Sequence, residues 1–80
     1  MNNLNVAKIQ LNGSSYEINR GTNLNELLNK LKIPKNKVAI EVNGEIVERK
    51  KYPNLTLNKD DKVEIVHFIG GGYSWRIFLQ

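Results

Sequence analysis

The sequence predicts an α+β domain, in which a mixed sheet of four to five strands carries one main helix packed on one face. Three observations predict this class. Apolar and polar residues alternate around two Asn-Gly pairs, as in half-buried hairpin strands. Leucines at helical spacing form a single stripe between the two pairs. The length of 80 residues is enough for one domain only.

The first expected element is a β-hairpin at roughly 4–19. Ala7, Ile9 and Leu11 alternate with polar residues before Asn12-Gly13, a pair that tolerates the positive φ angles of a tight turn. The alternation resumes after this pair, so the chain returns antiparallel to its first strand.

One helix is expected next, over about 23–32. Thr22 is the expected N-cap, because its hydroxyl can accept from an early helix N–H group, and Glu26 suits the positive end of the helix dipole. Pro34 cannot continue the helix. The stripe that this helix must bury consists of Leu24, Leu27, Leu28 and Leu31.

Two strands joined by a turn follow the helix. Residues 38–42, Val-Ala-Ile-Glu-Val, are dense in apolar side chains, which predicts an interior strand. Asn43-Gly44 repeats the turn signal, and a short strand at 45–47 leads away from it.

A connection and a turn lead to the last strand. Residues 52–57 read as a connection that tucks Leu55 and Leu57 inward, and 58–61 as a turn. The last strand spans 62–69, with Val63, Ile65 and Ile69 on the same face as His67. The helix must cover one face of the sheet, and we expect the first and last strands to pair in parallel at its centre. This is the β-grasp arrangement.

Composition narrows the possible functions. There is no cysteine, which excludes disulfides and thiolate metal sites. The N-terminus lacks the apolar segment of a signal peptide, so we expect a soluble cytoplasmic protein without membrane attachment. The net charge of +4 is spread along the chain with no aromatic platform beside it, which makes nucleic acid an unfavoured partner.

No catalytic or metal-binding set can be assembled from the sequence. His67 is the only histidine, and we expect it to pack at the sheet edge. Asp60-Asp61 fits a turn better than a catalytic carboxylate pair. Gly70-Gly71-Gly72 lacks the helix start and the lysine of a phosphate-binding loop. Glycines without Cβ instead suit either a thin, flexible tail that enters a partner's active site or a flexible turn before a sixth strand, and glycine content alone favours neither.

The chain resembles the ThiS-like sulfur carriers of thiazole assembly in thiamine biosynthesis, a ubiquitin-like β-grasp family, over about 9–72. The most specific matches are Val-Ala-Ile-Glu-Val-Asn-Gly-Glu-Ile-Val at 38–47 and the strand that ends in glycines at 60–72. Leu11-Asn12-Gly13 and the helix start at 22–28 add weaker support.

The resemblance implies a protein co-substrate and not an enzyme. A ubiquitin-activating-like adenylyltransferase would use ATP and Mg to adenylate the terminal glycine, and a cysteine desulfurase or sulfurtransferase would supply sulfur for a thiocarboxylate. Thiazole synthase would receive that sulfur. No cofactor is expected on the carrier itself, and its docking surface is expected on the exposed sheet face. The thiocarboxylate site is expected at Gly72, with Gly71 as the alternative and Gly70 as part of the tail.

Residues 73–80 depart from this pattern. Gly72 is linked to Tyr73 by a peptide bond and has no free carboxylate, so we divide the chain into a carrier domain at 1–72 and an apolar extension at 73–80. The extension could be an added strand, because Tyr73, Trp75, Ile77 and Leu79 alternate, or a recognition element for a processing protease, or a frame or cloning artefact.

Two alternatives to the thiazole carrier remain from the sequence. The first keeps the chemistry and changes the pathway, as in the small subunit of molybdopterin synthase or another thiocarboxylate carrier. The second is a non-catalytic β-grasp module that binds protein or RNA and retains its extension.

Overall fold

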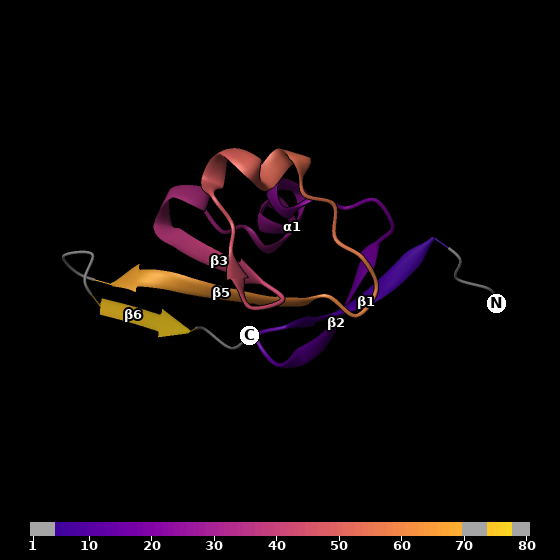
Figure 1. The fold of residues 1–80 in the computed structure, drawn as a ribbon, viewed down its shortest axis with the longest axis horizontal. Coiled ribbons are helices and arrows are strands. Elements are labelled where there is room, and N and C mark those ends of the chain that lie inside the picture. Colours follow the sequence, from indigo (N-terminus) through magenta and orange to yellow (C-terminus); the bar gives the residue numbers. More distant parts are fainter. Residues whose placement is uncertain (1–4, 70–73, 78–80) are drawn as a thin grey trace.

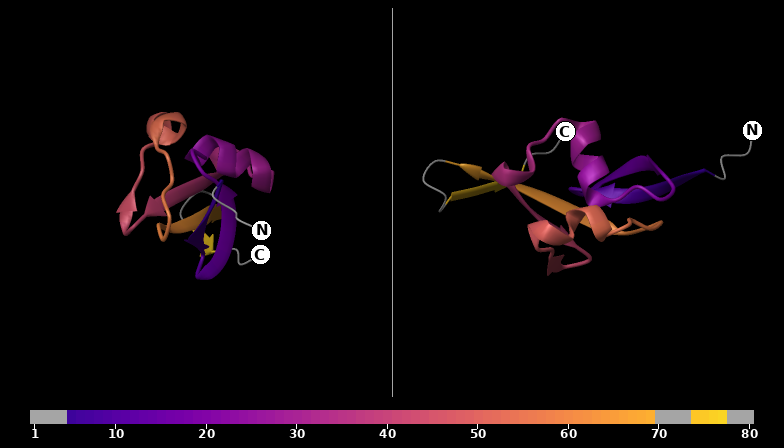
Figure 2. Two further views of the ribbon diagram at one scale, coloured as in Figure 1. Left: turned by 90° about the vertical axis from the view of Figure 1, so that its right-hand side faces the viewer. Right: turned by 90° about the horizontal axis from the view of Figure 1, so that it is seen from above.

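The computed structural model describes residues 5–69 and 74–77. Figure 1 shows one layer of strands with α1 and a 3₁₀ segment on one side of it, and Figure 2 shows the same two layers from the end and from above. The elements are β1 (Val6–Leu11), β2 (Ser14–Asn19), α1 (Leu24–Leu31), a 3₁₀ turn (Lys35–Lys37), β3 (Val38–Val42), β4 (Glu45–Ile46), a 3₁₀ segment (Arg49–Asn54), β5 (Lys62–Ile69) and β6 (Ser74–Ile77).

The sheet has the mixed topology that the sequence predicts. Its strand order is β2-β1-β5-β3-β4, and β6 also pairs with β5. β1 and β5 are parallel, with Gln10 opposite Lys62 and Leu11 opposite Val63, whereas the other strand pairs are antiparallel. The expected central pairing of the first and last strands is therefore confirmed, and β3 is interior as predicted.

Both Asn-Gly pairs form the expected turns. Asn12 has φ of 48° and Gly13 of 85°, and Asn43 and Gly44 have 53° and 87°. Positive φ at two successive residues matches the right-handed twist of the flanking strands, which is why these pairs favour hairpins. The first strand begins at Val6, slightly later than the expected start of the hairpin at residue 4.

The helix is shorter than expected, and its N-cap is Asn23 instead of Thr22. The Asn23 side chain accepts from the Glu26 N–H at 2.8 Å, while the Glu26 carboxylate accepts from the Asn23 N–H at 2.9 Å. These reciprocal bonds form a capping box. The Thr22 hydroxyl donates to the Asn19 carbonyl at 2.6 Å, so it closes the end of β2. At the other end, Lys32 is the C-cap in a left-handed conformation.

The core lies between α1 and the sheet. Three of the four stripe leucines are buried and Leu31 is half-buried, which confirms the predicted stripe. The other buried members come from the strands and from the connection before β5: Ala7, Ile9, Ile18, Val38, Ile40, Tyr52, Leu57, Val63 and Ile65.

The connection before β5 differs from the expectation at Tyr52. Leu57 is buried and Leu55 half-buried as predicted, but Arg49–Asn54 forms a 3₁₀ segment that also buries Tyr52, whose exposed fraction is 2%. Burial raises the pKa of the Tyr52 phenol, against smaller opposing effects of the Arg49 charge and a hydrogen bond with the Ile40 backbone. A tyrosine next to lysines and a proline carries no periodic signal, so the sequence did not predict its burial.

The C-terminal extension contributes a further strand, which takes the sheet beyond the expected four to five strands. β6 runs antiparallel to β5, with Ser74 opposite Ile69 and Ile77 opposite Val66. This arrangement agrees with the interpretation of the extension as an added strand. Tyr73 and Leu79, which belong to the same alternating pattern, lie outside the described residues.

Candidate functional site

The candidate site lies where β5 ends. Gly70, Gly71 and Gly72 lie outside the described residues, but the structure defines the strands before and after them. β5 ends at Ile69 and β6 begins at Ser74, and these two residues are register partners. In the full chain the glycines therefore belong to the connection between two antiparallel strands.

β5, the strand before this segment, is a buried interior strand of the sheet. It lies in the middle of the sheet, with β1 on one edge and β3 on the other. Val63 is fully buried, and Ile65 is 2% exposed. A chain segment that leaves such a strand starts from a well-defined position in the sheet.

β6 lies on the same edge of β5 as β1. Val66 and His67 pair with β3, and both also pair with β6, so these two strands must flank β5 on opposite sides. β1 pairs with β5 only at Lys62 and Val63, before the chain turns away at Asn12. The part of this edge beyond the end of β1 is therefore covered by β6 alone among the described strands.

The Asn12 side chain fills the gap between β1 and β6. Its Oδ1 accepts from the Ile65 N–H at 2.7 Å, and its Nδ2 donates to the Ile65 carbonyl at 3.3 Å. The main-chain N–H of Asn12 donates to the Val63 carbonyl at 2.9 Å. Asn12 thus extends the β1–β5 ladder by one step with a side-chain amide. It occupies the position on β5 next to Val66, where β6 ends.

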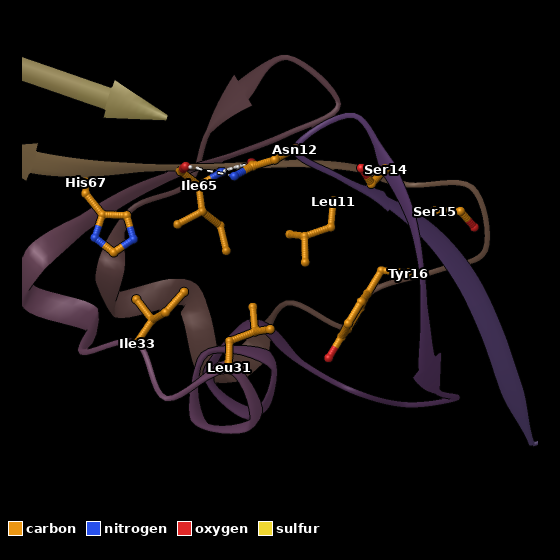
Figure 3. A pocket seen from close by; sticks show the side chains of 9 residues that line it. All are labelled: Leu11, Asn12, Ser14, Ser15, Tyr16, Leu31, Ile33, Ile65 and His67. Atoms are coloured by element: carbon orange, nitrogen blue, oxygen red, sulfur yellow. Dashed lines mark hydrogen bonds between the residues drawn. The ribbon is translucent and has the colours of Figure 1, made fainter. Parts of the chain in front are cut away.

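A pocket of about 200 Å³ lies beside this edge, on the helix side of the sheet. Figure 3 shows the His67 ring and the Ile65 side chain from β5 on one side of it, Tyr16 on the other, and Leu31 and Ile33 below. The Lys30 ammonium lies 5.3 Å from the centre of the Tyr16 ring, a favourable cation–π geometry. The pocket is smaller than typical sites for drug-sized ligands and suits a single apolar side chain.

His67 is half-buried on the helix-facing side of β5, on the face that the sequence predicts. The expected position at the sheet edge is wrong, because β5 lies between β1 and β3. Asp61 is also structural, as expected for a turn residue. Its two carboxylate oxygens accept from the Asn58 N–H at 2.7 Å and from the Asn43 side chain at 3.0 Å. These bonds hold the turn before β5 against the second Asn-Gly turn.

The described part of the chain offers no other obvious chemistry. Within residues 5–69 and 74–77, no group of three or more histidine, cysteine, aspartate or glutamate side chains could hold a metal ion. Within the same residues, no helix has the length and apolar character needed to cross a lipid bilayer. The candidate site is the end of β5, with its edge and its pocket.

Sequence reasoning missed the roles of the two turn asparagines. Asn12 bonds to the middle of β5, while Asn43 Oδ1 accepts from the Lys62 N–H at 2.9 Å at its start. The sequence did carry a signal, because both turns hold Asn where other residues that tolerate positive φ would also fit. The hydrogen-bond partners are more than fifty and nearly twenty residues away, so only the sheet topology reveals them.

Comparisons with known proteins agree with the fold. The sequence model of the ThiS family matches residues 9–72. The chain is 35% identical over 65 residues to the sulfur carrier protein ThiS of Bacillus subtilis, covering 80% of this chain and 98% of that protein. The crystal structure of the thiamine biosynthesis protein ThiS from Geobacter metallireducens superposes with a TM-score of 0.72 at 34% identity, covering 81% of this chain and 99% of that one.

A third similarity is to part of a longer protein. The chain is 46% identical over 65 residues to a thiazole synthase of Magnetococcus marinus, which is 81% of this chain but 20% of that protein. A thiazole synthase of Paramagnetospirillum magneticum gives the same coverage at 40% identity. The chain thus spans about a fifth of the length of these two relatives.

Proposed function

Because this chain belongs to the ThiS family of sulfur carrier proteins, we propose that it carries sulfur for thiazole formation as a thiocarboxylate on Gly72. One observation carries the choice of residue. The family match ends at Gly72, the last glycine of the run that follows the central strand β5. Gly71 is the alternative terminus.

The chemistry needs a free glycine carboxylate and an activating enzyme. A carboxylate is a poor electrophile, so it first attacks the α-phosphate of ATP, with Mg²⁺ on the nucleotide, and pyrophosphate leaves. A persulfide sulfur from a cysteine desulfurase or sulfurtransferase then attacks the acyl carbon, and AMP leaves with the bonding electrons. A thiol cleaves the resulting acyl disulfide and releases the thiocarboxylate. ATP and Mg²⁺ belong to the activating enzyme.

The carrier acts as a co-substrate in this scheme. Its own contribution is to present an acyl carbon on a narrow backbone at the end of β5. A glycine segment has no Cβ, so it can approach another enzyme's reacting groups closely. Holding that carbon next to the nucleotide makes the reaction effectively unimolecular once the two proteins are bound.

Thiazole synthase is the proposed acceptor of the sulfur. In two relatives named thiazole synthase, a segment similar to this carrier is part of the same longer chain. The presence of both parts in one chain supports a functional interaction between the carrier-like segment and the rest of those two proteins. It favours the thiazole pathway over molybdopterin synthesis for this chain.

The extension must be removed before this chemistry can start. An amide at Gly72 cannot form an acyl-adenylate by the route above, so a protease has to hydrolyse the Gly72–Tyr73 bond. We therefore propose that residues 1–72 are the working carrier and 73–80 a removable extension.

Intact mass spectrometry tests the proposal. The full chain, a chain ending at Gly72 and a chain ending at Gly71 are each incubated with the activating enzyme, ATP, Mg²⁺ and a persulfide donor. We expect only the chain ending at Gly72 to gain the mass difference between sulfur and oxygen, and to lose it again with thiazole synthase and its substrates. Absence of that gain in both trimmed chains, with an enzyme that is active on its own carrier, would contradict the proposal. RNA binding that weakens steeply with salt would favour the interaction-module alternative.

A further inference from the structure

We propose that the edge of β5 from Val66 to Ile69 is a docking edge for an extended segment of the activating enzyme, and that β6 occupies it in the full chain. This inference rests on the function proposed above. It assigns the extension a second effect, because the extension would cover a binding surface as well as block the Gly72 carboxylate.

The edge is suited to accept a strand. β1 leaves β5 after Val63, and Asn12 satisfies the Ile65 N–H and carbonyl. N–H and C=O groups of a strand point alternately to its two edges, so those of His67 and Ile69 point to the same edge as those of Ile65. β6 is seated there in antiparallel register over four residue pairs. The chain's own extension thus shows that an extended segment fits.

The short tail requires a docking surface near the end of β5. Three glycines span at most about 11 Å when fully extended. The acyl carbon of Gly72 can therefore lie no farther than this from Ile69, and whatever binds the carrier must border the nucleotide closely. A partner strand added at Val66–Ile69 would lie close to the nucleotide site, because it would bind the residues that immediately precede the glycines.

The pocket of about 200 Å³ offers a source of specificity. Ile65 and His67 line it, and both belong to the part of β5 next to or within this edge. When a peptide adds to a sheet edge, main-chain hydrogen bonds provide affinity and pockets for alternate side chains provide selectivity. We therefore expect the docking segment to carry an apolar side chain at the position that faces this pocket.

Backbone N-methylation at Ile69 tests the docking edge without changing a side chain. A synthetic chain 1–72 would be made unmodified and with one N-methyl group at Ile69. A matched control carries the N-methyl group at the exposed residue Glu17, on the outer edge of β2. The N–H groups of Gln10 and Asn12 point to β5, so the register places the Tyr16 N–H toward β1 and the Glu17 N–H away from the sheet. Thermal unfolding of the three chains checks their folds.

The readouts are the Kd for the activating enzyme and the rate of acyl-adenylate formation. We expect the Ile69 modification to weaken binding about tenfold, as for one lost main-chain hydrogen bond with a steric conflict, and the Glu17 modification to leave it unchanged. Equal affinities of the three chains, with normal adenylation, would overturn the docking edge and leave the proposed function intact. No adenylation of the unmodified chain would overturn both.

Hydrogen exchange provides a second measurement that needs no modified chain. In the unmodified chain 1–72, the amides of His67 and Ile69 should exchange faster than in the full chain, and should become protected when the activating enzyme binds. The Glu17 amide should exchange equally in all three states. Binding of the enzyme without protection at Ile69 would also overturn the docking edge, even if N-methylation at Ile69 destabilised the fold.

Discussion

Replacing Asn12 by glycine isolates the contribution of its side chain to the central sheet. Asn12 has φ of 48°, so Asn12→Gly keeps the turn permitted while it removes the two side-chain hydrogen bonds to Ile65. Each bond contributes about 0.5–1.5 kcal/mol net, and the loss is larger when the partner stays buried. We expect a decrease of about 2 kcal/mol in the free energy of unfolding.

Asn43 provides the matched control. It also precedes a glycine, has φ of 53°, and makes two side-chain hydrogen bonds, but these are exposed. Water can replace exposed partners, so we expect Asn43→Gly to cost about 1 kcal/mol or less. The larger unfolded-state entropy of glycine affects both variants equally and cancels in the comparison.

Urea and thermal unfolding of the full chain and both variants would measure the difference. For a domain of this size, about 2 kcal/mol corresponds to a decrease in Tm of roughly 8–16 °C. If Asn12→Gly destabilised no more than Asn43→Gly, the bonds to Ile65 would contribute nothing beyond an ordinary exposed contact. Asn12 would then not act as a stabilising extension of the β1–β5 ladder.

Three further predictions concern the core, the helix and the buried phenol. Leu27→Ala removes a side chain with no exposed surface and should lower the free energy of unfolding by about 2–5 kcal/mol in urea, whereas Ile46→Ala, at a residue that is 74% exposed, should change it by less than about 0.5 kcal/mol. Asn23→Ala breaks the capping box and should cost about 1 kcal/mol, measured by thermal unfolding, and a Thr22→Ala variant that cost more would contradict the assignment of the cap. Burial raises the pKa of Tyr52, so the folded state holds this proton more tightly than the unfolded state, and the stability it contributes is complete below pH 10 and decreases as the pH rises further. The urea midpoint should therefore fall more between pH 9 and 11 in the wild-type chain than in Tyr52→Phe, and equal falls would refute this.

The sequence predicts the order of the elements because this order depends on strong periodic signals, and it predicts the central parallel pair because that order is typical of the β-grasp arrangement. The leucines of α1 and the alternation at Ala7, Ile9 and Leu11 leave little choice of face. The prediction of Thr22 as the N-cap was wrong because the next residue, Asn23, is of a type that caps equally well. Thr22 does not cap the helix because its hydroxyl bonds to the Asn19 carbonyl at the end of β2, which leaves the cap to Asn23. Only the folded structure shows that contact.

One part of the candidate site could be predicted from the sequence and the other could not. The glycine run and its strand are visible in the sequence, because they are continuous in the chain. The edge of β5 that pairs with β1, the Asn12 side chain and β6 is not visible in the sequence, because these three parts are far apart along the chain. The pocket beside His67 also depends on residues from several elements, including Tyr16 of β2 and Ile33 after α1.

The central parallel pair has a consequence for how the chain acquires its structure. Gln10 and Leu11 pair with Lys62 and Val63, so the middle of the sheet closes a loop of about fifty residues. Before that loop closes, the β1–β2 hairpin and α1 lack the central strand that joins the two halves of the sheet. A lone hairpin is marginally stable in water. High sequence separation of this kind slows folding relative to a helical domain of equal size. We therefore expect fragments that end before β5 to lack stable structure, so the strand that leads into the glycines also completes the fold.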